Sequence, residues 1–215
     1  MPAMVNWTIQ QTYHIHNARR RKAGMLRMIW NKISAYKRNK WMGKLVRRGL
    51  KIGKNVQFDG DCFIDPDHCF LISIGDNCIF ADGVTLLAHD GATFPYIGIS
   101  KIGRITIKEN CAIAHSTIVF PGITIGPNSI VGAYSVVAKD IPPNSVAVGN
   151  PAKVICSLET YLKKHEENSK KYRLFHEKEY NIQIISEEKK IEMLDYLEKN
   201  RIAYMTGNIS DIFKE

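Results

Sequence analysis

An aliphatic residue recurs every six positions through the middle of the chain, and small residues often stand beside it. The positions in the longest run are Ile107, Ile113, Val119, Ile125, Val131 and Val137. This spacing matches neither the period of a helix, about 3.6 residues, nor the two-residue alternation of a strand. A fixed short period of this kind predicts a repeat architecture.

Each six-residue unit fits one short strand and a tight corner, with the aliphatic side chain pointing inward. Three such sides close a triangular coil, so about 18 residues advance the chain by one strand spacing of about 4.8 Å. The same register appears earlier, at Ile52, Phe58, Ile64, Ile74, Phe80 and Leu86. Stacked coils of this kind form a parallel β-helix. We expect two coils in the run 107–142 and roughly two more before it.

Two breaks interrupt this register. The spacing lengthens to ten residues before Ile74 and to 21 residues before Ile107. We expect a bulge at 65–68 and a loop at 87–106, since the second stretch contains several Gly residues and a Pro. Loops carried on a rigid repeat often hold the functional residues.

The five cysteines have an odd count and form no CxxC pair, which argues against a disulfide framework or a zinc finger. Cys62, Cys78 and Cys111 take the small inward position of the repeat, so we interpret them as buried apolar residues in a reducing compartment. Residues 1–18 lack the apolar stretch of a secretory signal. No run approaches the roughly 20 apolar residues of a membrane span. We expect a cytoplasmic location.

Positive charge is concentrated in residues 1–50, which hold 12 Lys and Arg and no Asp or Glu. The later parts are nearly balanced, with six basic against nine acidic residues in 51–150 and 12 of each in 151–215. Helical spacing within the basic segment relates Leu26, Ile29, Trp30, Ile33 and Tyr36. This pattern indicates a basic amphipathic helix.

Three interpretations of that helix stay open. It could pack on the β-helix or on a neighbouring subunit. It could instead contact an anionic membrane surface through residues 19–48, since Trp residues beside Lys and Arg suit an interface. Nucleic-acid binding is the weakest interpretation, because no nucleic-acid motif accompanies the charge. We divide the chain into a basic helical segment (1–50), a β-helix domain (51–157) and a C-terminal helical segment (158–215).

The stretch from 107 to 155 closely resembles the last coils of hexapeptide-repeat O-acetyltransferases, the group that includes maltose/galactoside, xenobiotic and capsule-polysaccharide acetyltransferases. The motifs that carry the resemblance are Phe120-Pro121-Gly122, Gly132-Ala133-Tyr134-Ser135-Val136-Val137, Lys139-Asp140-Ile141-Pro142 and Gly149-Asn150-Pro151-Ala152-Lys153. The resemblance implies an all-β core wound as a left-handed parallel β-helix, with flanking N- and C-terminal α-helices. It also implies a homotrimer, acetyl-CoA as acyl donor, and no metal.

His89 is the candidate general base. An alcohol that attacks the thioester must lose its proton, and a histidine, with an ordinary pKa of about 6.5, suits that task. The resemblance places the catalytic histidine at the start of the loop after Leu86, where His89 stands. Asp90 could orient it, or form a salt bridge to the next subunit.

Candidate cofactor residues are carried over from the same resemblance. Ala133 and Ala138 match positions whose backbone meets the pantetheine, and Lys139 and Lys153 match basic positions near the nucleotide end of coenzyme A. Cations there suit the phosphates. Ala114 and His115 match the slot near the thioester, where His115 donates to the oxyanion, contacts the pantetheine or is a neutral surface substitution.

Candidate acceptor residues lie in the early coils and the loop. Asp59, Asp61, Asp65 and Asp67 stand where galactoside-type relatives place sugar-binding side chains, and Asp90 joins them in the loop. Phe94 and Tyr96 could stack on a sugar face or cover the coil below.

These features predict an acetyl-CoA-dependent O-acetyltransferase that acts on a saccharide hydroxyl of a polysaccharide or lipid-linked glycan precursor. N-acetylation of an amino-sugar nucleotide and acetylation of a xenobiotic or antibiotic stay open as alternatives. A zinc-dependent, carbonic-anhydrase-like β-helix would need three converging histidines, and a non-catalytic β-helical binding module would not need His89. Nucleic acid is not an expected partner.

Overall fold

The computed structural model of the chain describes residues 40–181 and 184–207. They belong to two compact units, Met1–Arg48 and Gly49–Glu215, which are described separately. In the first unit, residues 40–47 are helical. The amphipathic pattern from Leu26 to Tyr36 lies outside the described residues, so the interpretations of that helix stay predictions. Within the described ranges, no helix is both long enough and apolar enough to cross a bilayer.

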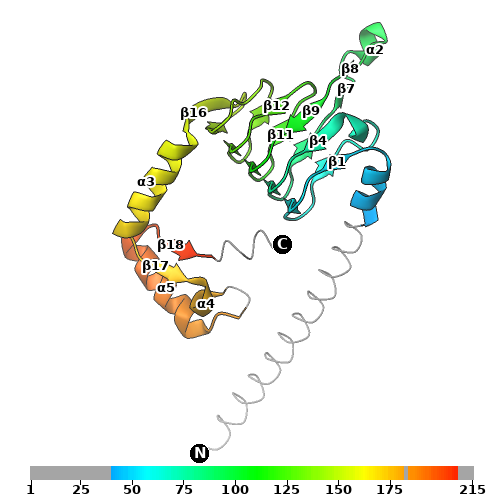
Figure 1. Ribbon diagram of the computed structural model, residues 1–215. Coiled ribbons are helices and arrows are strands. Elements are labelled where there is room, and N and C mark those ends of the chain that lie inside the picture. Colours follow the sequence, from blue (N-terminus) through cyan, green and yellow to red (C-terminus); the bar gives the residue numbers. More distant parts are fainter. Residues whose placement is uncertain (1–39, 182–183, 208–215) are drawn as a thin grey trace, which may run out of the picture. The chain divides into compact units, whose positions relative to one another are not determined.

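Stacked triangular coils form the core of the second unit (Figure 1). The first face runs in the order β1 (Lys51–Ile52), β4 (Ile72–Ile74), β9 (Ile105–Ile107) and β12 (Thr124–Ile125). The second face contains β2 (Gln57–Phe58), β5 (Ile79–Phe80), β10 (Ala112–Ile113), β13 (Ile130–Val131) and β15 (Ser145–Val148). The third face contains β3 (Phe63–Ile64), β6 (Thr85–Leu86), β11 (Ile118–Val119) and β14 (Val136–Val137). All of these neighbours pair in parallel, as expected for a parallel β-helix.

The predicted register holds through the third and fourth coils. Ile107 pairs with Ile125, and Val119 pairs with Val137, which is the expected step of one coil. The six aliphatic residues from Ile107 to Val137 expose at most 1% of their surface. Burial of each such side chain contributes roughly 1.5–3 kcal/mol before the entropy of ordering is subtracted. Ile52 and Phe58 are only half-buried, because β1 and β2 are edge strands with no coil below them.

The corner between the first and second faces is held by a ladder of asparagines. They are Asn55, Asn77, Asn110, Asn128 and Asn144. Each has a φ between 54° and 57°, a left-handed conformation that Asn tolerates better than most residues. Their side-chain amides donate from one coil to the next at 3.3, 3.1, 2.9 and 3.1 Å. The ladder fixes this corner in the same way on every coil.

The small inward residues also stack. Cys78 and Cys111 donate through Sγ to backbone carbonyls of the next coil, each at 3.0 Å, and both are buried. Ser129 makes the same contact one coil later, from Oγ to the carbonyl of Pro142 at 3.1 Å. Cys62 is only partly buried, in the first coil. A buried, hydrogen-bonded cysteine has a structural role here, in keeping with the sequence interpretation.

An antiparallel strand covers the last coil. β16 (Lys153–Ser157) pairs with β15, so the exposed edge of the second face is not left unpaired. The helix α3 (Leu158–Lys171) begins directly afterwards, with Ser157 Oγ accepting the N–H of Thr160 at 3.1 Å as its N-cap. The remaining elements are β17 (Leu174–His176), α4 (Glu177–Tyr180), α5 (Glu187–Asn200) and β18 (Tyr204–Thr206). The helices α3 and α5 lie in the segment 158–215, where the sequence predicts flanking helices.

Candidate active site

The two breaks in the register lie at the same corner of successive coils. The first insertion, 65–71, follows β3, and the second, 87–104, follows β6. Because β3 and β6 are paired neighbours, with Ile64 opposite Leu86, both insertions leave the third face side by side. We call this corner, formed by 65–71 and 87–104, the interrupted corner.

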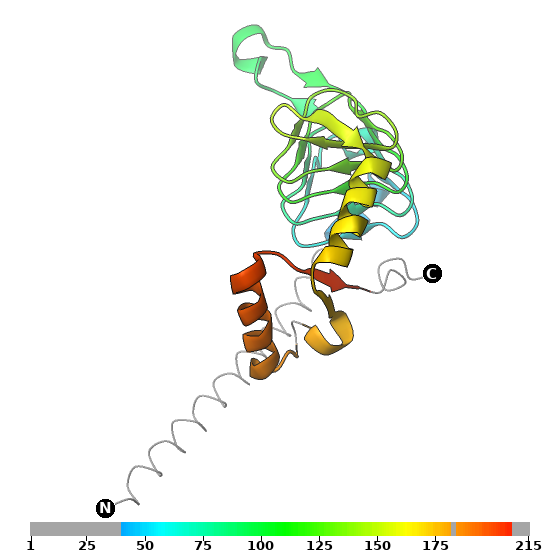
Figure 2. The ribbon, with the colours of Figure 1, turned by 90° about the vertical axis from the view of Figure 1, so that its left-hand side faces the viewer.

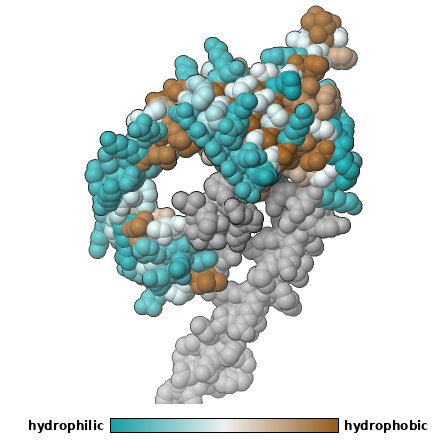
Figure 3. Space-filling view, in the orientation of Figure 1, coloured by the Kyte–Doolittle hydropathy of each residue, from teal (hydrophilic) through white to brown (hydrophobic). Residues whose placement is uncertain are grey.

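The second insertion is a hairpin that stands off from the coils (Figures 1 and 2). β7 (His89–Asp90) pairs antiparallel with β8 (Lys101–Ile102), and the short helix α2 (Phe94–Ile97) lies at the tip. Thr93 Oγ1 donates to the carbonyl of Ile99 at 2.5 Å, which closes the turn. The tip is apolar on its surface, as the brown patch over α2 shows (Figure 3). Phe94 and Tyr96 expose 60% and 86% of their surface, so they do not cover the coil below.

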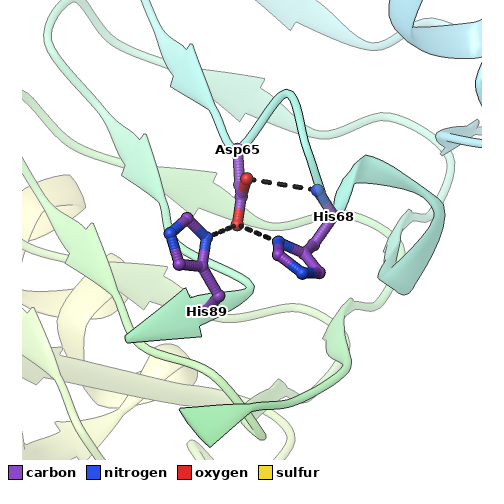
Figure 4. Close-up of side chains that lie close together, drawn as sticks. All are labelled: Asp65, His68 and His89. Carbon is purple, nitrogen blue, oxygen red and sulfur yellow. Dashed lines mark hydrogen bonds and ion pairs between the residues drawn. The ribbon is translucent and has the colours of Figure 1, made fainter. Parts of the chain in front are cut away.

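His89 and Asp65 meet at the interrupted corner (Figure 4). Nδ1 of His89 lies 2.5 Å from Oδ2 of Asp65. The Asp65 side chain is fully buried, whereas that of His89 is 39% exposed. Oδ1 of Asp65 accepts the backbone N–H groups of Asp67 and His68 at 3.1 and 3.2 Å. The carboxylate is therefore fixed from both sides, and it fixes the imidazole.

The electrostatics of Asp65 decide which nitrogen of His89 carries the proton. Burial, the largest single influence, raises the pKa of Asp65, but the hydrogen bond from His89 and the two backbone N–H groups together bring that pKa below its ordinary value. An ionised carboxylate can only accept a hydrogen bond, so Nδ1 of His89 carries a proton. In the neutral ring, Nε2 is then unprotonated and free to take a proton from a substrate.

His68 stands next to this pair. Its Nδ1 lies 3.5 Å from Oδ2 of Asp65, and its ring centroid lies 4.8 Å from that of His89. This Nδ1 atom is buried, and within the described part of the chain no hydrogen bond satisfies it. The three side chains form a compact group whose ligand atoms all lie within 4.8 Å of one another.

The predicted site residues divide between two corners of the coils. Asp67, Asp90, Phe94 and Tyr96 lie in the insertions of the interrupted corner. Ala138 and Lys139 follow β14, the strand next to β11 in the third face, so they lie at the same corner in the last coil. The other corner, between the second and third faces, carries Asp59, Asp61, Ala114, His115 and Ala133. One chain alone therefore does not bring all the predicted residues together.

The second of these corners carries a different histidine. His115 is exposed, and its ring makes an edge contact with the ring of Tyr134 at 5.5 Å between centroids. Tyr134 itself exposes 72% of its surface and donates its backbone N–H to the carbonyl of His115. Lys153 is exposed at the start of β16. The assignments of these residues to the cofactor stay predictions.

The orienting carboxylate was not found from the sequence. The sequence offers Asp90 for that task, but Oδ1 of Asp90 accepts the backbone N–H of Ala92 at 2.9 Å, and Nδ1 of His89 faces Asp65 instead. Adjacent side chains on a strand point to opposite sides, so Asp90 in β7 diverges from His89. A signal for Asp65 was present, because Asp65 directly follows Ile64 and the His89 loop follows Leu86, its register partner.

Comparison with known proteins identifies relatives of this chain. Protein CapG of Staphylococcus aureus is 36% identical over 173 residues, which cover 74% of this chain and 95% of CapG. Galactoside O-acetyltransferase of Escherichia coli (strain K12) is 37% identical over 116 residues, which cover 49% of this chain and 53% of that enzyme, so the match spans about half of its length. A solved structure of galactoside acetyltransferase in complex with coenzyme A is 33% identical over 53% of this chain and 68% of that chain, with a TM-score of 0.45. No protein-family model matches the chain.

The fold and the site define a β-helical acyltransferase with a carboxylate-supported histidine. With a relative matched over nearly its whole length, the chain belongs to the family of hexapeptide-repeat acetyltransferases. The expected fold class, a left-handed parallel β-helix with flanking α-helices, is confirmed, and so is the enzyme class.

Proposed function

We propose that the protein transfers an acetyl group from acetyl-CoA to a hydroxyl group of a saccharide, with His89 as general base. The observation that carries the proposal is the pairing of His89 with Asp65, which leaves Nε2 without a hydrogen-bond partner among the described residues, on a side chain that is 39% exposed. A carboxylate that holds the far nitrogen of an imidazole both orients the ring and stabilises the imidazolium that forms.

The reaction needs no covalent enzyme intermediate. Nε2 of His89 takes the hydroxyl proton as the acceptor oxygen bonds to the thioester carbon. The resulting tetrahedral intermediate expels the sulfur of coenzyme A, which receives that proton from the imidazolium. Direct attack agrees with the burial of Cys69, Cys78 and Cys111.

The cofactor residues follow from the sequence resemblance. We infer that Lys139 and Lys153 bind the phosphates of coenzyme A, and that the backbone at Ala133 and Ala138 lines the pantetheine. Ala114 and His115 would lie near the thioester, where His115 could donate to the developing oxyanion. Five of these six residues are exposed and Ala114 is partly buried, which leaves room for such contacts.

The division of these residues between two corners supports a homotrimer in which neighbouring chains complete each site. His89 lies at the interrupted corner, whereas His115 and Ala133 lie at the corner between the second and third faces. The exposed apolar tip at Phe94 and Tyr96 also suits contact with a second chain or with the acceptor. Light scattering that returns the mass of a monomer would remove this part of the proposal.

A saccharide acceptor is proposed from two features. The relative with the galactoside name is an O-acetyltransferase, and carboxylates at Asp59, Asp61 and Asp67 are exposed on this chain and suit paired hydroxyls. A location in the cytoplasm, with residues 19–48 against an anionic membrane surface, would bring the site to a lipid-linked glycan. That contact falls mainly outside the described residues and stays a prediction.

The test is acetyl-CoA turnover against a panel of sugars, nucleotide sugars and lipid-linked glycans. We expect acetylation of a hydroxyl acceptor that falls at least about 10²-fold in His89→Ala. His176→Ala is the matched control, because His176 lies in β17, outside the coils. Preference for an amino-sugar nucleotide would establish N-acetylation instead. Failure to bind acetyl-CoA would leave a non-catalytic binding module.

A further inference from the structure

His68 has a structural peculiarity that catalysis by His89 and Asp65 does not use. Its Nδ1 is buried and unsatisfied among the residues described, yet it points at the same carboxylate oxygen that holds His89 (Figure 4). A buried ring nitrogen that no hydrogen bond satisfies is unfavourable, and a bound ion is one of the few ways to satisfy it.

We propose that Asp65, His68 and His89 form an inhibitory zinc site. Two imidazole nitrogens and one carboxylate oxygen are a common set of protein ligands for Zn²⁺, with a water in the fourth position. All three ligand atoms lie within 4.8 Å of one another and come from one chain. The zinc acts here as an inhibitor and not as a cofactor of the transfer.

The cluster needs only a small rearrangement to hold the ion. Zinc bonds of about 2.0–2.2 Å in a tetrahedron place the ligand atoms about 3.4 Å apart. Oδ2 of Asp65 and Nδ1 of His68 lie 3.5 Å apart, which already matches this separation. Oδ2 of Asp65 and Nδ1 of His89 lie 2.5 Å apart, and this distance must open by about 1 Å. The side chain of His89 has room to move, because it is 39% exposed and lies in β7 at the base of the projecting hairpin.

The surroundings also suit a metal ligand. Oδ1 of Asp65 stays bonded to the backbone N–H groups of Asp67 and His68, so the second oxygen is presented in a fixed direction. Outer hydrogen bonds of this kind orient carboxylate ligands in known metal sites. The side chains of His68 and His89 are 30% and 39% exposed, which gives the ion a path from solvent.

Zinc at this position would block the base through the choice of tautomer. The ion binds Nδ1 of His89 in place of the proton, and a neutral imidazole bound through Nδ1 carries its single proton on Nε2. Nε2 then has no lone pair for the hydroxyl proton. The neutral ring of His89 keeps its single proton, which only moves from Nδ1 to Nε2, so the block itself releases no proton to solvent. This inhibitory half rests on the proposed function, whereas zinc binding does not.

Binding is tested by calorimetry with zinc on chelator-dialysed full-length protein, comparing the intact chain with His68→Ala and His176→Ala. We expect one tight site per chain, weakened at least about 10-fold in His68→Ala and unchanged in His176→Ala. All three proteins keep the histidines that lie outside the described residues, so any zinc bound by those histidines contributes equally to the three measurements. Equal affinity in the intact protein and His68→Ala would overturn the site.

A second variant guards against misfolding. Asp65→Asn is nearly isosteric and removes the anionic ligand, and circular dichroism melts report whether each variant folds. Co²⁺ in place of zinc adds a direct signature, because tetrahedral cobalt absorbs strongly in the visible range. We expect that absorption in the intact protein and its loss in both cluster variants; its persistence in both would overturn the assignment of the ligands.

The rate of acetyl transfer tests inhibition by zinc separately from zinc binding. The readout is the ratio of acetyl-transfer rates with and without zinc in each protein, and we expect a lower ratio in the intact chain than in His68→Ala. If zinc binds at the cluster while turnover is unchanged or rises, the inhibition is wrong and the metal site stands. If no acceptor is acetylated, the proposed function fails, and calorimetry still decides the metal site.

Discussion

Two corners of the same β-helix show how this chain separates stability from chemistry. The corner between the first and second faces repeats on every coil, and its five asparagines are linked one to the next by side-chain hydrogen bonds. The interrupted corner breaks the repeat twice in succession and gathers Asp65, His68 and His89. A regular corner can hold a ladder because each coil is the same, and a site needs coils that differ.

The sharpest contrast between the two corners is expected at His89. His89→Ala should lower kcat/KM at least about 10²-fold, because no other group replaces its Nε2 as base. The melting temperature should fall only modestly, because the buried Asp65 loses one hydrogen bond and keeps those from the backbone N–H groups of Asp67 and His68. Acetyl-transfer assays and thermal melts on the same sample measure kcat/KM and the melting temperature. A large loss of stability would instead make His89 a structural residue.

A core residue should show the opposite behaviour. Ile113 exposes 1% of its surface between the coils of β5 and β13, so Ile113→Ala should lower the free energy of unfolding by about 2–5 kcal/mol. Urea unfolding measures this loss. The control is Ile102→Ala, at a residue 61% exposed in β8, which should change stability by less than about 0.5 kcal/mol. Comparable losses in the two variants would contradict the assignment of the core.

A substitution in the asparagine ladder should have a smaller effect on the free energy of unfolding, and two variants separate its causes. Asn110 has a φ of 57° and two ladder bonds, so Asn110→Ala should cost about 1–2 kcal/mol of unfolding free energy. Asn110→Gly loses the same bonds but suits the left-handed backbone, so it should cost less. Chemical denaturation of both variants separates backbone strain from hydrogen bonding. A larger loss in the glycine variant would show that strain is not the main term.

The smallest effect is expected at Lys139. It is exposed, and Lys139→Ala should raise the KM for acetyl-CoA about 3- to 10-fold with little change in kcat, because one phosphate contact is lost. The effect should shrink at high salt, where exposed charges are screened. Lys139→Arg keeps the charge and is the matched control. An unchanged KM at low salt would remove Lys139 from the cofactor site.

Much of the coil architecture was predictable because the repeat is strict where nothing interrupts it. The run from Ile107 to Val137 fixed the inward residues and the 18-residue step. The ladder was harder to see, since its asparagines are separated by 22, 33, 18 and 16 residues. Insertions stretch the first two intervals and hide a period that is regular in space.

The site was predictable only in part. His89 followed from its position after Leu86, but its partner Asp65 lies 24 residues earlier, in a different coil. Both insertions begin after paired strands, so their proximity could have been derived from Ile64 and Leu86. The burial of His68 Nδ1 depends on how the chain turns between Asp65 and the short helix Cys69–Leu71, which no period encodes.

The most direct test of the account is a double-mutant cycle on Asp65→Asn and His89→Ala, with kcat/KM for acetyl transfer as the readout. If Asp65 acts by holding His89, its substitution slows the intact enzyme but has almost no further effect once His89 is gone, so the double variant matches His89→Ala. Effects of the two substitutions that multiply would contradict the account, because Asp65 and His89 would then act independently.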